Sequence, residues 1–270
     1  MSGAMPRPPL AAEEVKSCCA ELYSSDVAKM LVGESFHPGG VELTGRLGEL
    51  MELSPQHHVL DVASGLGTSA IHLAQRFSCR VTGVDLSARN VERATEAAAM
   101  AGISDRVFFW KGDAEGLPFP AASFDAVVCE CAFCTFPDKP TAASEMTRVL
   151  RHGGLVGISD LTRNRELPED LRGLLAWIAC VGDAGSVDSY RQHLTEAGLS
   201  SVRVENHDHA LVEMVDGIRL KLMAASLMVA LKKVDWAGGD WKSARDMAAR
   251  ALREVKQGNL GYTILVATKA

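Results

Sequence analysis

Between residues 57 and 160 the sequence alternates short apolar runs with helix-length segments, and this alternation restricts the fold more than any other feature. Strands separated by helices of about 10–14 residues are joined by right-handed crossovers and form a parallel sheet that is covered on both faces. The sequence therefore predicts a doubly wound α/β fold. The expected strands are residues 58–62, 80–85, 107–110, 124–129 and 153–160, and the expected helices are 69–76, 88–101 and 140–150.

The segments on either side of this core are mainly helical. Residues 1–10 are Pro-rich and aperiodic, which predicts a flexible tail. Two helices, at 12–31 and 41–52, follow on either side of a Pro-Gly-Gly loop. After residue 160 we expect helices at 167–181, 186–197, 211–234 and 243–257, and strands at 201–205 and 262–268.

This pattern predicts a single domain over residues 11–270, without internal repeats. Residues 11–52 form its N-terminal helical cap, residues 57–160 its ligand-binding core, and residues 161–270 a helical insertion with the closing strands. The net charge of −6 argues against a nucleic-acid or anionic-membrane partner, because both require a basic face. No apolar run is long enough to span a bilayer, and the N-terminus lacks the apolar core of a signal peptide. We therefore expect a cytoplasmic protein.

A glycine-rich turn follows the first strand of the core, in the stretch Asp61-Val-Ala-Ser64-Gly65-Leu-Gly67. The two glycines let the backbone approach a ligand closely, and the turn lies at the carboxyl end of its strand. The stretch is not the three-glycine phosphate motif, and a carboxylate suits an ammonium group better than a pyrophosphate. Asp85, which ends the second strand, is placed to accept both hydroxyls of a ribose, and the Asp113 carboxylate after the third strand to read an adenine amino group.

In this order and spacing, residues 59–160 resemble the class I S-adenosylmethionine-dependent methyltransferases. The resemblance implies a seven-stranded, mostly parallel sheet with an antiparallel last hairpin, whose edge strands are residues 202–205 and 262–268. It also implies that S-adenosylmethionine lies over Gly65 and Gly67 and leaves as S-adenosylhomocysteine. The expected cofactor residues are Asp61, Ser64, Gly65, Gly67, Thr68, Asp85, Leu86, Asp113, Ala114 and Cys129.

The acceptor is expected to enter beside the end of the fourth strand, where Cys129, Cys131 and Cys134 occur within six residues. The chain has seven cysteines, and an odd count in a cytoplasmic protein indicates free thiols. Each of the three is either a small buried apolar residue or a soft ligand suited to arsenic(III). A zinc site is less favoured, because no second Cys pair or His pair has the required spacing. We expect no resident metal.

A narrower resemblance connects residues 137–198 with the arsenite methyltransferases. Cys180 matches an arsenic-binding cysteine of that family, and Cys131 matches a position that is often cysteine there. Two further family cysteines are absent, because the glycine turn has Ala70 instead and no cysteine follows Cys180. Our hypothesis is that Cys131, Cys134 and Cys180 rebuild a trithiolate site, and the resemblance makes arsenic(III) the first expected acceptor of a methyltransferase that acts on small soft nucleophiles. Two N-terminal residues, Cys18 and Cys19, are candidates for a mobile thiol.

A small thiol or sulfide is the alternative acceptor, in a soft-lined pocket where Glu130, His37 or Asp160 holds the thiolate form. An organic O-, N- or C-acceptor is a third possibility. A protein of another class, a non-catalytic S-adenosylmethionine-binding sensor, fits the same cofactor motifs. The partner is in each case a small molecule, and the oligomeric state is open.

Overall fold

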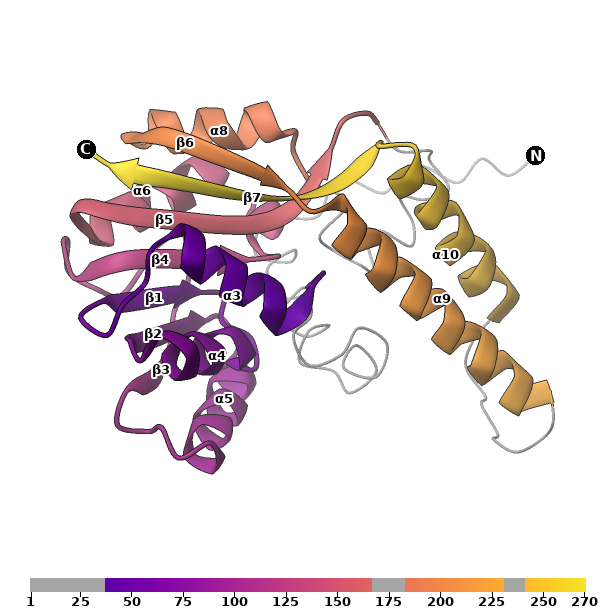
Figure 1. The fold of residues 1–270 in the computed structure, drawn as a ribbon, viewed down its shortest axis with the longest axis horizontal. Coiled ribbons are helices and arrows are strands. Elements are labelled where there is room, and N and C mark those ends of the chain that lie inside the picture. The colour runs from indigo at the N-terminus through magenta and orange to yellow at the C-terminus, as the bar shows by residue number, and fades with distance from the viewer. Residues whose placement is uncertain (1–36, 167–182, 231–240) are drawn as a thin grey trace, which may run out of the picture.

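The computed structural model describes residues 37–166, 183–230 and 241–270, and its centre is one seven-stranded sheet (Figure 1). The strand order is β3-β2-β1-β4-β5-β7-β6. Strands β1 to β5 pair in parallel, and β7 runs antiparallel to both β5 and β6. The predicted mostly parallel α/β sheet is therefore confirmed. The strands are β1 (His58–Val62), β2 (Arg80–Asp85), β3 (Val107–Lys111), β4 (Phe124–Glu130), β5 (Leu150–Arg163), β6 (Leu199–Asn206) and β7 (Leu260–Lys269).

Seven α-helices of the described segments flank the sheet (Figure 1). Helix α3 packs on α4 and contacts β5, whereas α4 and α5 pack on β2 and β3. Helix α6 pairs with α8, and the long helices α9 and α10, which come between β6 and β7 in sequence, pack against each other. They are α3 (Gly40–Leu50), α4 (Thr68–Phe77), α5 (Ala88–Met100), α6 (Lys139–Val149), α8 (Val187–Glu196), α9 (Asp208–Ala230) and α10 (Trp241–Lys256), with a 3-10 turn η1 (Phe133–Thr135) after β4.

Local sequence accounts for these elements. The inner strands β1 and β4 are apolar on both faces because helices cover both sides of the sheet. Helix α5 begins at Ser87, whose hydroxyl accepts a hydrogen bond from the Asn90 amide at 3.3 Å. Helix α6 begins in the same way at Asp138, which accepts from the Thr141 amide at 3.0 Å. Such N-caps satisfy amides that have no partner within the helix.

The C-terminal strands differ from the expectation in one respect. Strand β7 was expected at an edge, but it lies between β5 and β6, so only β6 is an edge strand. Residues 260–267 of β7 are all buried, and a strand apolar on both faces belongs inside a sheet. Asp208 starts α9, three residues before the start expected for this helix.

The expected helices at 12–31 and 167–181 lie outside the described residues. The same is true of Cys18, Cys19 and Cys180. Among the helices that are described, none is long and apolar enough to cross a membrane. The parallel strands β1 to β5 direct their carboxyl ends to one edge of the sheet, and the predicted site residues gather there.

Candidate active site

The glycine turn between β1 and α4 needs its glycines for two different reasons. Both Gly65 and Gly67 have a positive φ, of 52° and 78°, a backbone conformation that side chains disfavour. A Cβ at Gly67 would meet Phe109 Cζ at 2.6 Å and Ala94 Cβ at 2.9 Å, whereas a Cβ at Gly65 would have nothing within 4 Å. Gly67 is therefore required for packing, and the space over Gly65 is open to a ligand.

Asp85 ends β2 and is tied to the glycine turn. One carboxylate oxygen accepts from the Gly65 amide at 2.9 Å, and the other accepts from the Ser87 amide at 2.9 Å and from Asn90 Nδ2 at 3.1 Å. Burial raises the pKa of Asp85, and these three hydrogen bonds oppose the shift. Sequence reasoning missed Asn90, whose five-residue spacing from Asp85 places it on the first turn of α5. It fixes the carboxylate expected to hold the ribose.

Asp61 lies on β1, before the glycine turn, and one oxygen of its buried carboxylate has no hydrogen-bond partner among the described residues. Burial raises the pKa of Asp61 well above its ordinary value, and the nearby carboxylates of Glu130 and Asp85 raise it further. Within the described part of the chain, neither Asp61 Oδ2 nor the buried Ser64 hydroxyl finds a hydrogen-bond partner. A buried carboxylate requires a cation or a donor. The ammonium and sulfonium charges of S-adenosylmethionine fit this requirement.

The remaining residues expected to hold the cofactor lie on the same edge. Asp113 and the buried Ala114 follow β3, where Asp113 Oδ1 accepts from the Glu115 amide at 2.9 Å and shapes the turn. Leu86 follows β2 with 37% of its surface exposed, and Thr68 begins α4. The residues expected to hold the cofactor thus follow three adjacent strands, β1, β2 and β3.

The cysteines after β4 occupy unequal environments. Burial, assisted by three neighbouring carboxylates, raises the pKa of Cys129 well above its ordinary value, which favours the neutral thiol. Cys134 is fully buried in η1, and the half-buried Cys131 has a left-handed φ of 51°. No group of three His, Cys, Asp or Glu residues in the described segments is arranged to hold a metal ion. The proposed third thiolate, Cys180, lies outside those segments.

Asp160, expected as an alternative base, instead accepts hydrogen bonds from the backbone of η1 and of β5. Its Oδ2 accepts from the Cys134 amide at 2.8 Å, and its Oδ1 accepts from the Leu161 amide at 2.7 Å. The residue is completely buried. Both oxygens thus bind backbone amides, as expected of a carboxylate that shapes a loop.

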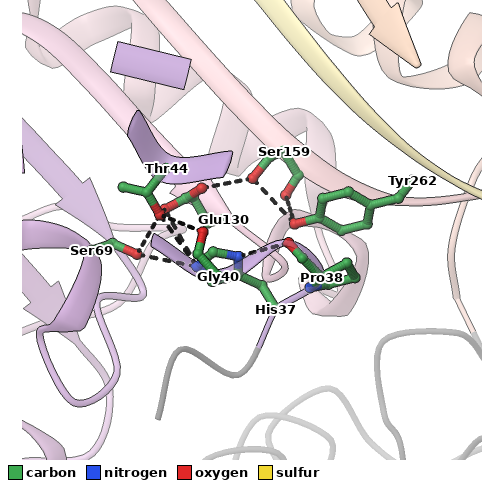
Figure 2. Close-up of polar contacts among 8 residues, drawn as sticks. All are labelled: His37, Pro38, Gly40, Thr44, Ser69, Glu130, Ser159 and Tyr262. Carbon is green, nitrogen blue, oxygen red and sulfur yellow. Dashed lines mark hydrogen bonds and ion pairs between the residues drawn. The ribbon is translucent and has the colours of Figure 1, made fainter. Parts of the chain in front are cut away.

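His37 and Glu130 do come together, in a buried polar cluster (Figure 2). His37 Nε2 lies 3.8 Å from Glu130 Oε2. The Thr44 hydroxyl donates to Glu130 Oε2 at 2.8 Å, and the Ser159 hydroxyl donates to Glu130 Oε1 at 3.0 Å. His37 Nε2 also lies 3.5 Å from the hydroxyl of Ser69, on the first turn of α4. The cluster therefore adjoins the helix that starts at the glycine turn.

Sequence reasoning missed four members of this cluster: Thr44, Ser69, Ser159 and Tyr262. They come from α3, α4, β5 and β7, and each is a single hydroxyl in an otherwise ordinary element. Thr44 offered one usable signal, because it lies on the apolar, buried face of α3 beside Leu43 and Leu47. A buried hydroxyl on such a face requires a polar partner, and the partner is Glu130.

The chain is similar in sequence to proteins of known family. Residues 59–154 match the family described as "Methyltransferase domain". The 27-O-demethylrifamycin SV methyltransferase of Amycolatopsis mediterranei is 33% identical over 201 residues, which cover 67% of this chain and 72% of that protein. The chain belongs to the class I S-adenosylmethionine-dependent methyltransferases. Its methyl donor is accordingly S-adenosylmethionine, and the expectation of a methyltransferase with this cofactor is confirmed.

Other similarities define how far the likeness extends. An arsenite methyltransferase of Halobacterium salinarum is 30% identical to this chain, over 58% of this chain and 41% of the arsenite methyltransferase. A crystal structure described as a putative sarcosine dimethylglycine methyltransferase, from Galdieria sulphuraria, has a TM-score of 0.76 at 20% identity, covering 92% of this chain and 98% of that one. The latter shows the shared fold. The relatives act on chemically different acceptors, so the narrower resemblance to arsenite methyltransferases is one similarity among several.

Proposed function

We propose that this methyltransferase transfers a methyl group to a hydroxyl oxygen of a small organic molecule, with His37 as the general base. The observation that carries the proposal is the contact between His37 Nε2 and the buried carboxylate of Glu130, at 3.8 Å. A neutral hydroxyl is a weak nucleophile, and a base within reach activates it. Glu130 stabilises the positive charge that the imidazole gains.

The cofactor roles of the site residues are part of this proposal. Asp85 takes the ribose hydroxyls, Asp61 and Ser64 face the methionine end, and Asp113 with Ala114 faces the adenine. When bound, the sulfonium cofactor supplies an activated methyl group, and the chain positions the acceptor in line with it and excludes water. The O-methylation suggested by the name of the rifamycin relative supports an oxygen acceptor.

Arsenite is the second candidate acceptor, supported by the neighbouring thiols of Cys131 and Cys134 and by the arsenite methyltransferase among the relatives. A thiolate site requires ionised sulfur, and the raised pKa of Cys129 disfavours it there. A small thiol or sulfide is the third candidate, with His37 as the same base. A sensor that binds the cofactor without turnover is the alternative of another class. In each case we propose a cytoplasmic protein with a small-molecule partner.

Labelled cofactor and an acceptor panel separate these candidates. The panel contains small phenols and alcohols, arsenite, sulfide and methanethiol. We expect turnover of hydroxyl acceptors that falls about 100-fold or more in His37→Gln, the usual scale of general-base catalysis. The matched control is His152→Gln, an exposed histidine on β5. Turnover restricted to arsenite and abolished by Cys131→Ser or Cys134→Ser would establish arsenic chemistry instead, and cofactor binding without any turnover would indicate the sensor.

A further inference from the structure

We infer that Ser159 and Tyr262 are positioning residues, which hold Glu130 as an acceptor-only carboxylate facing the proton-accepting nitrogen of His37. The inference rests on the proposed function, because it concerns the same base. Ser159 lies on β5 and Tyr262 on β7, and Figure 2 shows the Ser159 hydroxyl between the Tyr262 hydroxyl and the Glu130 carboxylate. Neither residue reaches His37 directly, so both act through Glu130.

A count of protons gives this chain of hydrogen bonds a direction. The Ser159 hydroxyl has one hydrogen, which it donates to Glu130 Oε1 at 3.0 Å. Its oxygen is then an acceptor for the Tyr262 hydroxyl, which lies 3.2 Å away and 3.1 Å from the Ser159 carbonyl oxygen. Complete burial raises the pKa of Tyr262 well above its ordinary value, so the phenol keeps its proton and remains a donor.

The other carboxylate oxygen is held from the opposite side. Thr44, on α3, donates its hydroxyl hydrogen to Glu130 Oε2 at 2.8 Å. Both oxygens of Glu130 therefore accept from hydroxyl groups, and the carboxylate has no need to carry a proton of its own. The side chain is only 3% exposed. Hydrogen bonds to an ion are stronger than those between neutral groups, and they offset the cost of burying the charge.

The histidine ring has a defined orientation in the same cluster. His37 Nδ1 lies 3.1 Å from the carbonyl oxygen of Pro38, which only accepts hydrogen bonds. Nδ1 therefore carries the hydrogen, and in the neutral ring Nε2 has the lone pair. Nε2 lies 3.4 Å from the Thr44 hydroxyl oxygen, 3.5 Å from the Ser69 hydroxyl oxygen and 3.8 Å from Glu130 Oε2. This nitrogen thus faces the carboxylate that Ser159 and Tyr262 fix.

The atoms of the proposed reaction balance around this nitrogen. The acceptor oxygen forms a bond to the methyl carbon as the sulfur–methyl bond breaks, and the sulfur keeps that electron pair. The hydroxyl proton passes to His37 Nε2, which becomes an imidazolium beside the Glu130 carboxylate. A carboxylate fixed in place before the reaction stabilises this charge without reorganising.

A double-mutant cycle tests whether Tyr262 acts through Glu130. We expect Tyr262→Phe and Ser159→Ala to lower kcat about tenfold, with the acceptor KM and the cofactor Kd unchanged. In a Glu130→Gln background, Tyr262→Phe is expected to cause no further loss, because the group that it positions is gone. The matched control is Tyr190→Phe. Tyr190 is an equally buried tyrosine on α8 whose hydroxyl donates to the Leu161 carbonyl at 3.1 Å.

The ¹⁵N spectrum of the His37 ring provides a readout that needs no acceptor. In the neutral ring we expect a protonated Nδ1 and an unprotonated Nε2, with the Nε2 resonance displaced by Tyr262→Phe and by Ser159→Ala but unchanged by Tyr190→Phe. Fully additive losses in the cycle, or an unaltered His37 spectrum in both variants, would overturn the positioning role. A displaced resonance together with an unchanged kcat in His37→Gln would instead remove the proposed base and keep the positioning chain.

Discussion

The cofactor side and the acceptor side of this methyltransferase are built in opposite ways. On the cofactor side, Asp61, Gly65, Gly67 and Asp85 lie within one short strand–turn–helix–strand unit. On the acceptor side, the contacts join residues far apart in sequence: Thr44 and Glu130 are 86 positions apart, and Ser159 and Tyr262 are 103 positions apart. The residues proposed to hold the cofactor are brought together by local backbone geometry, whereas the residues around the proposed base are brought together by tertiary contacts.

This difference has a chemical basis. A Gly-rich turn and the carboxylate after the next strand meet wherever parallel strands are adjacent, because the sheet aligns their carboxyl ends. A proton-handling site has no such constraint and needs only that a base and its partner meet within a hydrogen-bonding distance. Changes on the cofactor side should therefore weaken cofactor binding, and changes on the acceptor side should alter kcat alone.

The largest effect is expected at Gly67. In Gly67→Ala the new Cβ lies 2.6 Å from Phe109 Cζ in a backbone with φ 78°, so the turn must shift. We expect at least a 100-fold loss of cofactor affinity, about 2.8 kcal/mol, together with a lower melting temperature, measured by calorimetry. The control Gly65→Ala adds a Cβ with nothing within 4 Å, so in the free protein it carries only the conformational cost of about 1–2 kcal/mol. Equal melting temperatures for the two variants would show that the turn is less rigid than this packing implies.

Asp85→Asn tests the next contact on the cofactor side. The amide replaces one acceptor oxygen, so the Gly65 amide or the Ser87 amide loses its partner. A hydrogen bond to a charged group contributes about 1.5–3 kcal/mol, and we expect cofactor affinity to fall roughly 10- to 100-fold. Titration with S-adenosylhomocysteine measures the change. An unchanged affinity would show that this carboxylate does not hold the ribose.

The substitution Asp61→Asn is expected to weaken cofactor binding while stabilising the free protein. Because burial raises its pKa in the folded state, the folded chain holds this proton more tightly than the unfolded chain, and the stability contributed by Asp61 falls as pH rises through the folded pKa. Asp61→Asn removes that cost, so its melting temperature at neutral pH should exceed that of the wild type. Binding of the cationic cofactor favours the ionised form, so cofactor affinity should fall as pH is lowered through the same range in the wild type.

In Asp61→Asn, cofactor affinity should be about tenfold weaker and should lose the part of its pH dependence that Asp61 causes. Calorimetric titrations at several pH values, in the wild type and the variant, check both statements. A variant that is less stable than the wild type at neutral pH would contradict the sign derived from burial.

The two regions also differ in what the sequence could predict. The alternating core and the turn at Gly65 were predictable because strand period, glycine and strand-end carboxylates are local signals. The position of β7 inside the sheet was not, because a β-branched apolar strand reads alike at an edge and in the interior. Only part of the cluster around His37 could be predicted from the sequence. His37 and Glu130 were candidates by type, but Ser159 and Tyr262 carry no sequence signal and meet Glu130 only in the folded chain.

Cys79 belongs to neither the cofactor side nor the acceptor side, so its substitution is expected to have the smallest effect on function. It is fully buried at the start of β2, its sulfur donates to the Leu73 carbonyl at 3.5 Å, and burial raises its pKa to about 11. Cys79→Ala should cost about 1 kcal/mol of unfolding free energy through lost packing and leave both cofactor affinity and kcat unchanged. Urea unfolding and the standard assay measure the two quantities. A drop in kcat would mean that the packing around Cys79 affects the active site. The cofactor side and the acceptor side would then be less independent than their contacts indicate.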